Sequence, residues 1–289
     1  MLDERVRKEI LTAQGNEVTE YLIYKKLSDS TKDSANRNVL RRIADDELKH
    51  YKFWKKQTGE DVSPHTLKVW WYVIISKLLG LTFGIKLMEN GEKGAQLNYG
   101  KISKAIASAR RIAADEERHE KQLIAMIDEE KLRYVGSIVL GLNDALVEFT
   151  GALAGFTFAL QSTRLVAVTG LIMGFAASLS MAASEYLSTK SESGGKNPVK
   201  ASVYTGSIYM LTVFLLVLPF FALPTVYQSL AVTILTAIVI IYMFTFYISV
   251  AKDLSFKQRF IEMTAISLGV AALTFAIGYV VKIAFGIQI

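Results

Sequence analysis

Two glutamate–histidine pairs have the residue types and spacing of a metal site in this chain of 289 residues. In Glu47–His50 and in Glu116–His119, the histidine follows the glutamate by three positions. On a helix this spacing puts a carboxylate and an imidazole on one face, one turn apart. Two such pairs that face each other in a four-helix bundle, with glutamates from the other two helices, form a di-iron or di-manganese site. The spacing therefore predicts a carboxylate-bridged pair of metal ions, Fe²⁺/Fe³⁺ or possibly Mn²⁺.

The remaining ligands are expected on the other two helices of that bundle. A carboxylate-bridged metal pair needs several hard oxygen donors and one nitrogen for each metal. We expect the first-helix ligand to be Glu17, with Glu20 as the alternative. The full predicted ligand set is Glu17, Glu20, Glu47, His50, Glu89, Glu92, Glu116 and His119.

A second group of acids lies in apolar sequence. Asp144 and Glu148 are four residues apart, so a helix would place them on one face. An ionisable residue within a membrane span marks a candidate functional site, because its burial must be offset by a partner, water or an ion. The pair predicts a cation path, and the alternative is that both lie near the cytosolic end and contact water.

Met181 and Glu185 repeat the four-residue spacing in the next apolar stretch. A soft thioether together with a hard carboxylate suits a borderline transition metal better than Na⁺ or Mg²⁺. The alternative for Met181 is ordinary apolar packing.

The helices that must position these residues can be read from the sequence. In residues 1–130, Asp33 or Ser30 is a candidate N-cap of the second helix, and Gly59 is a candidate stop. The predicted helices of this part run over about 3–28, 31–58, 66–90 and 95–130.

Residues 131–289 are predicted to form a membrane domain. Five stretches reach the length of about 20 residues that a bilayer core requires, and three of them lack any Asp, Glu, Lys or Arg over most of their length. The fold class is therefore all-α, a four-helix bundle followed by five transmembrane helices. The predicted spans are 135–161, 165–187, 201–223, 226–250 and 264–286.

Loop charges predict that the N-terminal domain lies in the cytosol and the C-terminus outside, in the cell membrane of a prokaryote. The start of the chain has no apolar run of the signal-peptide kind. With the N-terminus inside, the outer loops hold Arg164 alone. These loop cations supply much of the net charge of +6, so no nucleic-acid partner is implied. The inner loops hold Lys131, Arg133, Lys190, Lys196, Lys200, Lys252, Lys257 and Arg259.

The absence of cysteine narrows the chemistry. It excludes disulfides, thiolate catalysis and Cys-ligated zinc or iron–sulfur centres. It also excludes a rubredoxin-type iron centre, which needs four thiolates.

Two further patterns concern packing. Gly151 and Gly155 are four residues apart, which allows close helix approach and fits a first span at a dimer interface. The apolar third helix of the bundle contains Trp70, Trp71 and Tyr72. These rings could lie at the membrane interface, where such side chains concentrate, or at a dimer face, or they could be ordinary core.

Residues 1–130 resemble the ferritin-like domain of the rubrerythrin family. The marks are the two Glu-x-x-His pairs, two glutamates three apart at Glu89 and Glu92, and Glu17 followed seven residues later by Tyr24. The resemblance implies a di-iron four-helix bundle. The chain departs from rubrerythrin by lacking its rubredoxin cysteines, so a peroxidase fed through that centre is not expected.

Residues 131–289 resemble the vacuolar iron transporter family. The marks are Asn143-Asp144 followed by a Gly/Ala-rich stretch, Ser-Met-x-x-x-Glu-Tyr-Leu-Ser around Met181 and Glu185, and five spans. The resemblance implies a homodimer that exports Fe²⁺ or Mn²⁺ from the cytosol in exchange for H⁺, with the pathway at the dimer interface. Asp144 and Met181 match the metal residues of that family, and Glu185 is their neighbour. The fusion resembles a known type, the membrane-bound ferritin-like transporter.

Together these features predict a divalent-iron exporter whose N-terminal domain binds or senses cytosolic Fe²⁺. The alternative is a membrane-anchored di-iron oxidase, ferroxidase or peroxidase whose spans serve only as an anchor. Five spans with internal acids exceed what an anchor requires, which favours the transporter. The choice between iron and manganese stays open.

Overall fold

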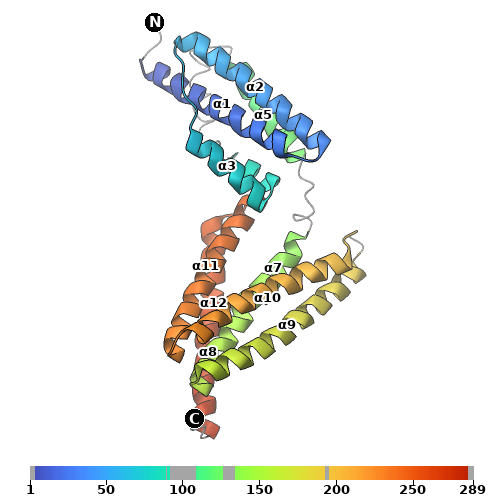
Figure 1. The fold of residues 1–289 in the computed structure, drawn as a ribbon, viewed down its shortest axis with the longest axis vertical. Helices are drawn as coiled ribbons and strands as arrows, with labels where there is room; N and C mark the ends of the chain where they lie inside the picture. Colours follow the sequence, from blue (N-terminus) through green and yellow to red (C-terminus); the bar gives the residue numbers. More distant parts are fainter. Residues whose placement is uncertain (1–3, 89, 92–108, 126–133, 193–194, 286–289) are drawn as a thin grey trace. The chain divides into compact units, whose positions relative to one another are not determined.

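The computed structural model describes residues 4–88, 90–91, 109–125, 134–192 and 195–285 (Figure 1). The regular structure of these residues is all helical, with no strand among them. The chain divides into two compact units, the N-terminal unit (Met1–Glu129) and the membrane unit (Glu130–Ile289). Each unit has its own buried apolar core.

An antiparallel helix pair forms the centre of the N-terminal unit. The long helices α1 (Glu4–Ser30) and α2 (Ser34–Thr58) pack along each other, with α3 (Thr66–Leu79) against α1 and α5 (Ala109–Ala125) against α2 (Figure 1). α2 is amphipathic and buries Leu40, Ile43, Ala44, Glu47, His50 and Trp54. Its buried face therefore carries one of the two glutamate–histidine pairs.

The ends of α2 follow the sequence signals. The Asp33 side chain accepts a hydrogen bond of 2.7 Å from the Asn36 backbone N–H, which satisfies one of the free donors of the first turn. Gly59 ends the helix with φ 71°, in the left-handed region that glycine adopts without strain. Of the two candidate N-caps the structure uses Asp33 and not Ser30, and the predicted stop at Gly59 is confirmed.

The third predicted helix does not run continuously over 66–90. It ends at Leu79 because Gly80 adopts φ 107°, outside helical values, and a second helical stretch covers 81–88. A Cβ on Gly84 would lie 1.8 Å from the Ser76 Oγ, so only glycine permits this close return. The start predicted for the fourth helix near residue 95 lies outside the described residues.

The membrane unit contains five helices or helix series that are long and apolar enough to cross a membrane. The first is interrupted: α7 (Val135–Asp144) passes through a π-helical turn, η1 (Ala145–Phe149), into α8 (Thr150–Leu160). The fifth begins at residue 256, earlier than the predicted 264. The other spans are α9 (Thr163–Ser191), α10 (Pro198–Ala222), α11 (Val226–Lys252) and α12 (Phe256–Phe285).

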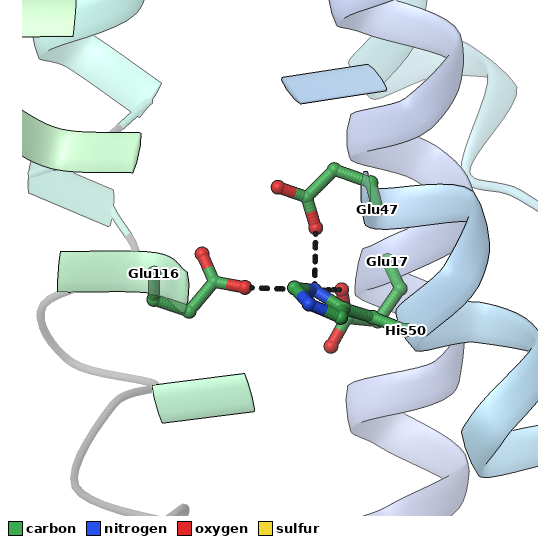
Figure 2. A group of neighbouring side chains, drawn as sticks. All are labelled: Glu17, Glu47, His50 and Glu116. Carbon is green, nitrogen blue, oxygen red and sulfur yellow. Dashed lines mark ion pairs between the residues drawn. The ribbon is translucent and has the colours of Figure 1, made fainter. Parts of the chain in front are cut away.

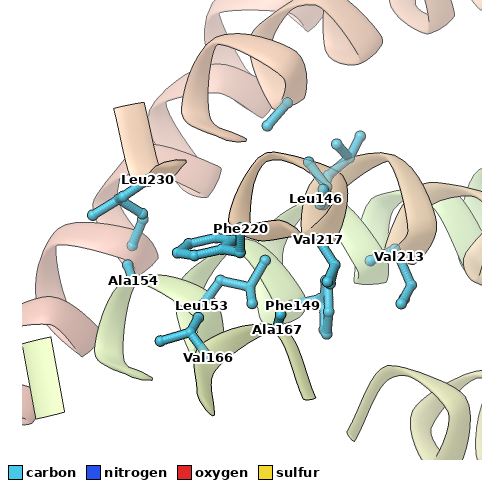
Figure 3. Packing of buried hydrophobic residues seen from close by; sticks show 14 of the residues in the cluster. Leu146, Phe149, Leu153, Ala154, Val166, Ala167, Val213, Val217, Phe220 and Leu230 are labelled. Carbon is cyan, nitrogen blue, oxygen red and sulfur yellow. The ribbon is translucent and has the colours of Figure 1, made fainter. Parts of the chain in front are cut away.

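The core of the membrane unit joins the first span to its neighbours. Phe149 and Leu153 are fully buried against Val213 and Val217 of α10 and Val166 of α9 (Figure 3). Many other apolar side chains of the unit are exposed, as expected of surfaces that face lipid. The chain is therefore an integral, multi-pass membrane protein, with its spans in this unit.

Gly151 and Gly155 pack against α12 of the same chain, and a dimer interface at the first span stays a prediction. A Cβ on Gly155 would lie 3.1 Å from the Thr274 backbone oxygen, and one on Gly278 would lie 2.6 Å from the Gly155 oxygen. The Thr274 hydroxyl donates a hydrogen bond of 2.7 Å to the Gly151 carbonyl. The small residues thus bring α8 against α12, because the missing side chains allow the two backbones to approach closely.

Candidate metal centre and membrane acids

Four side chains of the N-terminal unit converge into one group of metal-ligating atoms. Glu17, Glu47, His50 and Glu116 each present one such atom, and these atoms lie within 4.8 Å of one another. Glu116 reaches the group from α5, while the other three come from α1 and α2 (Figure 2). First-row divalent metals bind oxygen and nitrogen at about 2.0–2.2 Å, which separates opposite ligands by about 4.4 Å. A small inward shift would therefore close this group around an ion.

Two of the glutamates connect both histidines. Glu47 places Oε2 3.4 Å from the His50 Nδ1 and Oε1 3.0 Å from the His119 Nδ1. Glu116 repeats the arrangement, with Oε1 3.2 Å from the His50 Nδ1 and Oε2 3.9 Å from the His119 Nδ1. The two imidazole rings are 5.9 Å apart between centroids. Each carboxylate therefore offers one oxygen to each histidine, as a bridging ligand would.

Both histidines are oriented by aspartates on the opposite helix. The His50 Nε2 lies 3.4 Å from the Asp115 Oδ2, and the His119 Nε2 lies 3.3 Å from the Asp46 Oδ2. A carboxylate on one ring nitrogen fixes the tautomer and directs the other nitrogen toward a metal. Arg118 contacts both aspartates, at 2.8 Å and 3.4 Å, and holds them in place. The two Nδ1 atoms are thus left to face the centre of the group.

The first-helix glutamate is held by an indole. The Trp54 Nε1–H donates a hydrogen bond of 3.0 Å to the Glu17 Oε1, and Trp54 itself is fully buried. Trp54 lies four residues after His50 on α2, so the same helix face supplies a ligand and a hydrogen-bond donor for another ligand. The contact leaves the Glu17 Oε2 pointing to His50, at 3.4 Å from its Nδ1.

Burial dominates the electrostatics of the group. It raises the pKa of Glu47 well above its usual value, and the nearby charge of Glu116 adds to the rise. Burial likewise raises the pKa of Glu116. For His50 burial acts downward, but the contacts with Glu116, Glu17 and Glu47 outweigh it and raise the pKa. The metal-free group therefore retains protons that a cation would have to displace.

The group fits a divalent metal on its own geometry. The Glu47 Oε2, His50 Nδ1, Glu116 Oε1 and His119 Nδ1 are buried and make no hydrogen bond of normal geometry with another described residue. Buried polar atoms are seldom left in this way, because an unsatisfied group costs about 1–3 kcal/mol. Oxygen and imidazole donors without thiolate suit iron or manganese. These residues could therefore hold a metal ion of that kind.

The structure separates the two candidates on the first helix. Glu17 is 1% exposed and belongs to the group, whereas Glu20 lines a neighbouring cavity of about 120 Å³ together with Thr19 and Lys68. Tyr24 is buried in the apolar core of the unit. Glu89 and Glu92 lie outside the described residues.

Sequence reasoning missed the two orienting aspartates and the tryptophan. The signal was available, since both motifs read Asp-Glu-x-x-His: Asp46 directly precedes Glu47, and Asp115 directly precedes Glu116. Only the assembled helices show that each aspartate serves the histidine of the other motif. Trp54 carried no comparable signal, because a tryptophan on a buried helix face is most often core.

The acids of the first span lie at the π-helical turn. Asp144 is the last residue of α7 and Glu148 lies inside η1. Asn143 and Asp144 are half-buried, and Glu148 is exposed. A π-turn widens a helix by one residue and occurs frequently at functional sites. The Glu148 and Asp144 side chains contact each other across this turn, in agreement with the shared face expected from their spacing.

Glu185 of α9 is hydrogen-bonded to Ser137, near the start of the first span. Its Oε1 accepts hydrogen bonds from the Ser137 hydroxyl, at 2.5 Å, and from the Thr189 hydroxyl, at 3.4 Å. Met181, one turn earlier on α9, is half-buried and packs against the apolar core. Among the described residues, Asp144, Glu148 and Glu185 do not form one cluster of ligating atoms.

Tyr209 of α10 is a polar residue of the core that the sequence did not single out. Its side chain is fully buried, and its hydroxyl makes no hydrogen bond with another described residue. The hydroxyl lies close enough to Glu148 and Asp144 for their charges to act on it. Tyr209 and the two acids therefore form one polar patch, which extends from the core to the exposed carboxylate of Glu148.

Comparison with known proteins bears on the first two spans. A family model described as the VIT family matches residues 135–194. This match supports a vacuolar iron transporter domain. The VIT family indicates a membrane transporter of metal ions such as iron or manganese, and the matched residues include Asp144, Glu148, Met181 and Glu185. No curated protein and no solved structure matches the chain.

Proposed function

We propose that this chain exports Fe²⁺, or Mn²⁺, from the cytosol through its membrane unit in exchange for protons, as a homodimer. The observation that carries the proposal is the VIT family match over the first two spans. All the acids predicted to line the ion path fall inside the matched residues.

In this proposal the cation passes Asp144, Glu148, Met181 and Glu185. Support comes from the π-turn that follows Asp144 and contains Glu148, and from the polar environment that Ser137 provides for Glu185. Metal ligands must be deprotonated when they bind, so the carboxylates release protons as the cation enters. Release into the cytosol, the side of metal uptake, followed by reprotonation from outside once the metal has left, would couple export to proton entry.

The N-terminal unit is proposed to collect the cytosolic metal before transport. Its buried group has the donor types of a ferritin-like site, and the bridging geometry of Glu47 and Glu116 suits two ions as well as one. The cytosolic placement rests on the cations of the inner loops. In this role the group buffers or senses Fe²⁺ and needs no redox step.

Uptake into proteoliposomes tests the transport proposal. Wild-type protein should admit Fe²⁺ or Mn²⁺ along the gradient, while Asp144→Asn and Glu185→Gln should reduce uptake to the level of empty liposomes. Glu192→Gln is the matched control, because this exposed residue is the C-cap of α9, about two turns beyond Glu185. Absence of wild-type uptake, or full uptake in both variants, would overturn the proposal.

The second candidate is a membrane-anchored ferroxidase. It is favoured by one observation, that Glu47 and Glu116 each face both histidines as bridging carboxylates do. Oxygen consumption on addition of Fe²⁺, lost in Glu47→Ala and unchanged in Asp144→Asn, would support this activity. Metal transport by the protein without any oxygen consumption would exclude ferroxidase activity.

A further inference from the structure

Helix α3 presents an apolar face to solvent. Among the described residues of the N-terminal unit, every large apolar side chain that is exposed lies on this helix. Their exposed fractions range from 40% at Leu79 to 87% at Leu67, and the five other than Leu79 lie along one side of the helix. We define this surface as the α3 face, formed by Leu67, Trp70, Trp71, Ile74 and Leu78.

The α3 face is not needed by the core of its own unit. The opposite side of the helix already packs inward through Val69 and Val73, which are 3% and 4% exposed. Tyr72 packs partly against the same core. Trp70 and Trp71 are exposed, so ordinary core packing, one of the alternatives for the aromatic cluster, is wrong for these two residues. Contiguous exposed apolar surface of this kind marks a site of contact with a protein or a membrane.

The charged residues of the α3 segment are all cations, and Glu20 of α1 lines the cavity beside Lys68. No aspartate or glutamate occurs between Asp61 and Glu89, while Lys68 and Lys77 belong to α3 itself. Lys26 of α1 adds a cation over the Trp70 ring, with its Nζ 4.7 Å from the ring centroid. Aromatic rings with lysines beside them are typical of helices that lie in the headgroup region of a bilayer.

The length of chain beyond α5 restricts what the α3 face can reach. α5 ends at Ala125 and the first span begins at Val135. Ten peptide steps extend over at most about 35 Å. A surface on the N-terminal unit is therefore never more than a few nanometres from lipid headgroups, which gives lipid a high effective concentration.

A second copy of the chain is a poorer occupant for this face. A two-fold contact would bring the same patch of both copies together, so the lysines beside the face in one copy would lie near those of the other. Anionic headgroups instead complement both lysines, and the apolar rings enter the region just below the headgroups.

We propose that the α3 face docks onto an anionic lipid surface and holds the N-terminal unit against the membrane. The five apolar side chains enter the interface, and Lys68 and Lys77 contact the headgroups. This inference does not depend on what the chain transports.

The tryptophans supply a direct test. The chain has three, Trp54, Trp70 and Trp71, all in the N-terminal unit, and Trp54 is fully buried. Full-length protein is placed in nanodiscs made with phosphatidylglycerol whose acyl chains carry bromine, which quenches tryptophan at short range. Tryptophan emission of the wild type should be lower in brominated than in unbrominated lipid. In W70F/W71F only Trp54 emits, and its emission should be the same in both lipids. Equal emission of the wild type in both lipids, or equal quenching of the double variant, would overturn the proposal.

A charge variant tests the choice of lipid. Removing the two α3 lysines in K68Q/K77Q should weaken docking by roughly fivefold per lysine, because each contributes about that factor near an anionic surface. K52Q/K56Q, two exposed lysines of α2, removes the same charge and should leave quenching unchanged. Equal effects of the two double variants would count against the proposal. Emission that depends on the number of chains per nanodisc and not on bromine would assign the face to a second copy and overturn it.

Discussion

Replacing Glu47 by glutamine should have opposite effects on the metal-free and metal-bound N-terminal unit. Glu47 is 1% exposed, and burial together with the charge of Glu116 raises its pKa well above the usual value of 4.5. The folded protein therefore binds this proton more tightly than the unfolded chain does. The resulting stability is complete below about pH 4.5 and is lost as the pH rises through the folded pKa.

At neutral pH the wild type thus has a buried group that prefers to be neutral. Glutamine has the same shape without the charge, so metal-free Glu47→Gln should be more stable than the wild type. We expect a gain on the order of 1 kcal/mol, because each pKa unit between the folded and unfolded states corresponds to about 1.4 kcal/mol. The pH dependence of its unfolding should also be shallower, because one linked proton is gone.

With metal the order should reverse. At a metal concentration of a hundred times the Kd, binding stabilises the wild type by about 2.7 kcal/mol. Glu47 is the residue whose oxygens face both His50 and His119, at 3.4 Å and 3.0 Å from their Nδ1 atoms. If its loss raises the Kd a hundredfold, the same metal concentration stabilises the variant by only about 0.4 kcal/mol.

Urea unfolding of the full chain in detergent, followed by tryptophan emission, measures both effects. All three tryptophans lie in the N-terminal unit, so the signal excludes unfolding of the membrane unit. Mn²⁺ serves as the added metal because it is stable in air. Glu117→Gln is the control, since this exposed glutamate pairs only with Lys121 among the described contacts, and a surface change should stay within about 0.5 kcal/mol. A Glu47→Gln variant that is less stable without metal, or that keeps the full response to Mn²⁺, would refute the reasoning.

Three other expectations concern the metal group and the span packing. Asp46→Asn and Asp115→Asn should each weaken Mn²⁺ binding about 10–100-fold in titration calorimetry, because each aspartate orients a histidine, while exposed Asp45→Asn should not. Mn²⁺ binding should tighten between about pH 5 and pH 7 and should release protons, seen as a heat that depends on the buffer, because burial raises the carboxyl pKa values. Gly141→Ala should lower the free energy of unfolding of the membrane unit by about 1–3 kcal/mol, since its Cβ would lie 2.5 Å from a backbone oxygen of α10. Gly136→Ala is the control, because a Cβ on Gly136 meets no described atom within 4 Å. Recovery of monodisperse protein after heating compares the two glycine variants, and equal recovery would contradict the packing argument.

The helices and spans could be predicted because their signals are local. Asp33 and Gly59 mark the ends of α2 through contacts within one turn, and long apolar runs mark the five spans. Gly80 shows the limit of such signals. A glycine inside an apolar helical pattern is compatible with a continuous helix, and only the return of Gly84 against Ser76 makes the break necessary.

Packing partners could not be read from spacing alone. Gly151 and Gly155 indicate a close helix contact, but the same small residues would serve a second chain as well as α12. The π-turn at Asp144 was likewise hidden, because η1 has an ordinary apolar composition. These features depend on which surface faces each residue, and that surface comes from another part of the chain.

For the metal group, the sequence by itself determined the ligand types and their local arrangement. Helical geometry places Glu47 with His50, and Glu116 with His119, whatever the tertiary structure. Only the tertiary structure decided that the pairs share one buried group, that Glu17 completes it, and that the aspartate of each motif orients the histidine of the other. The reason is physical: a contact within one helical turn follows from backbone geometry, whereas contacts between residues 46 and 119 exist only once α2 and α5 pack together.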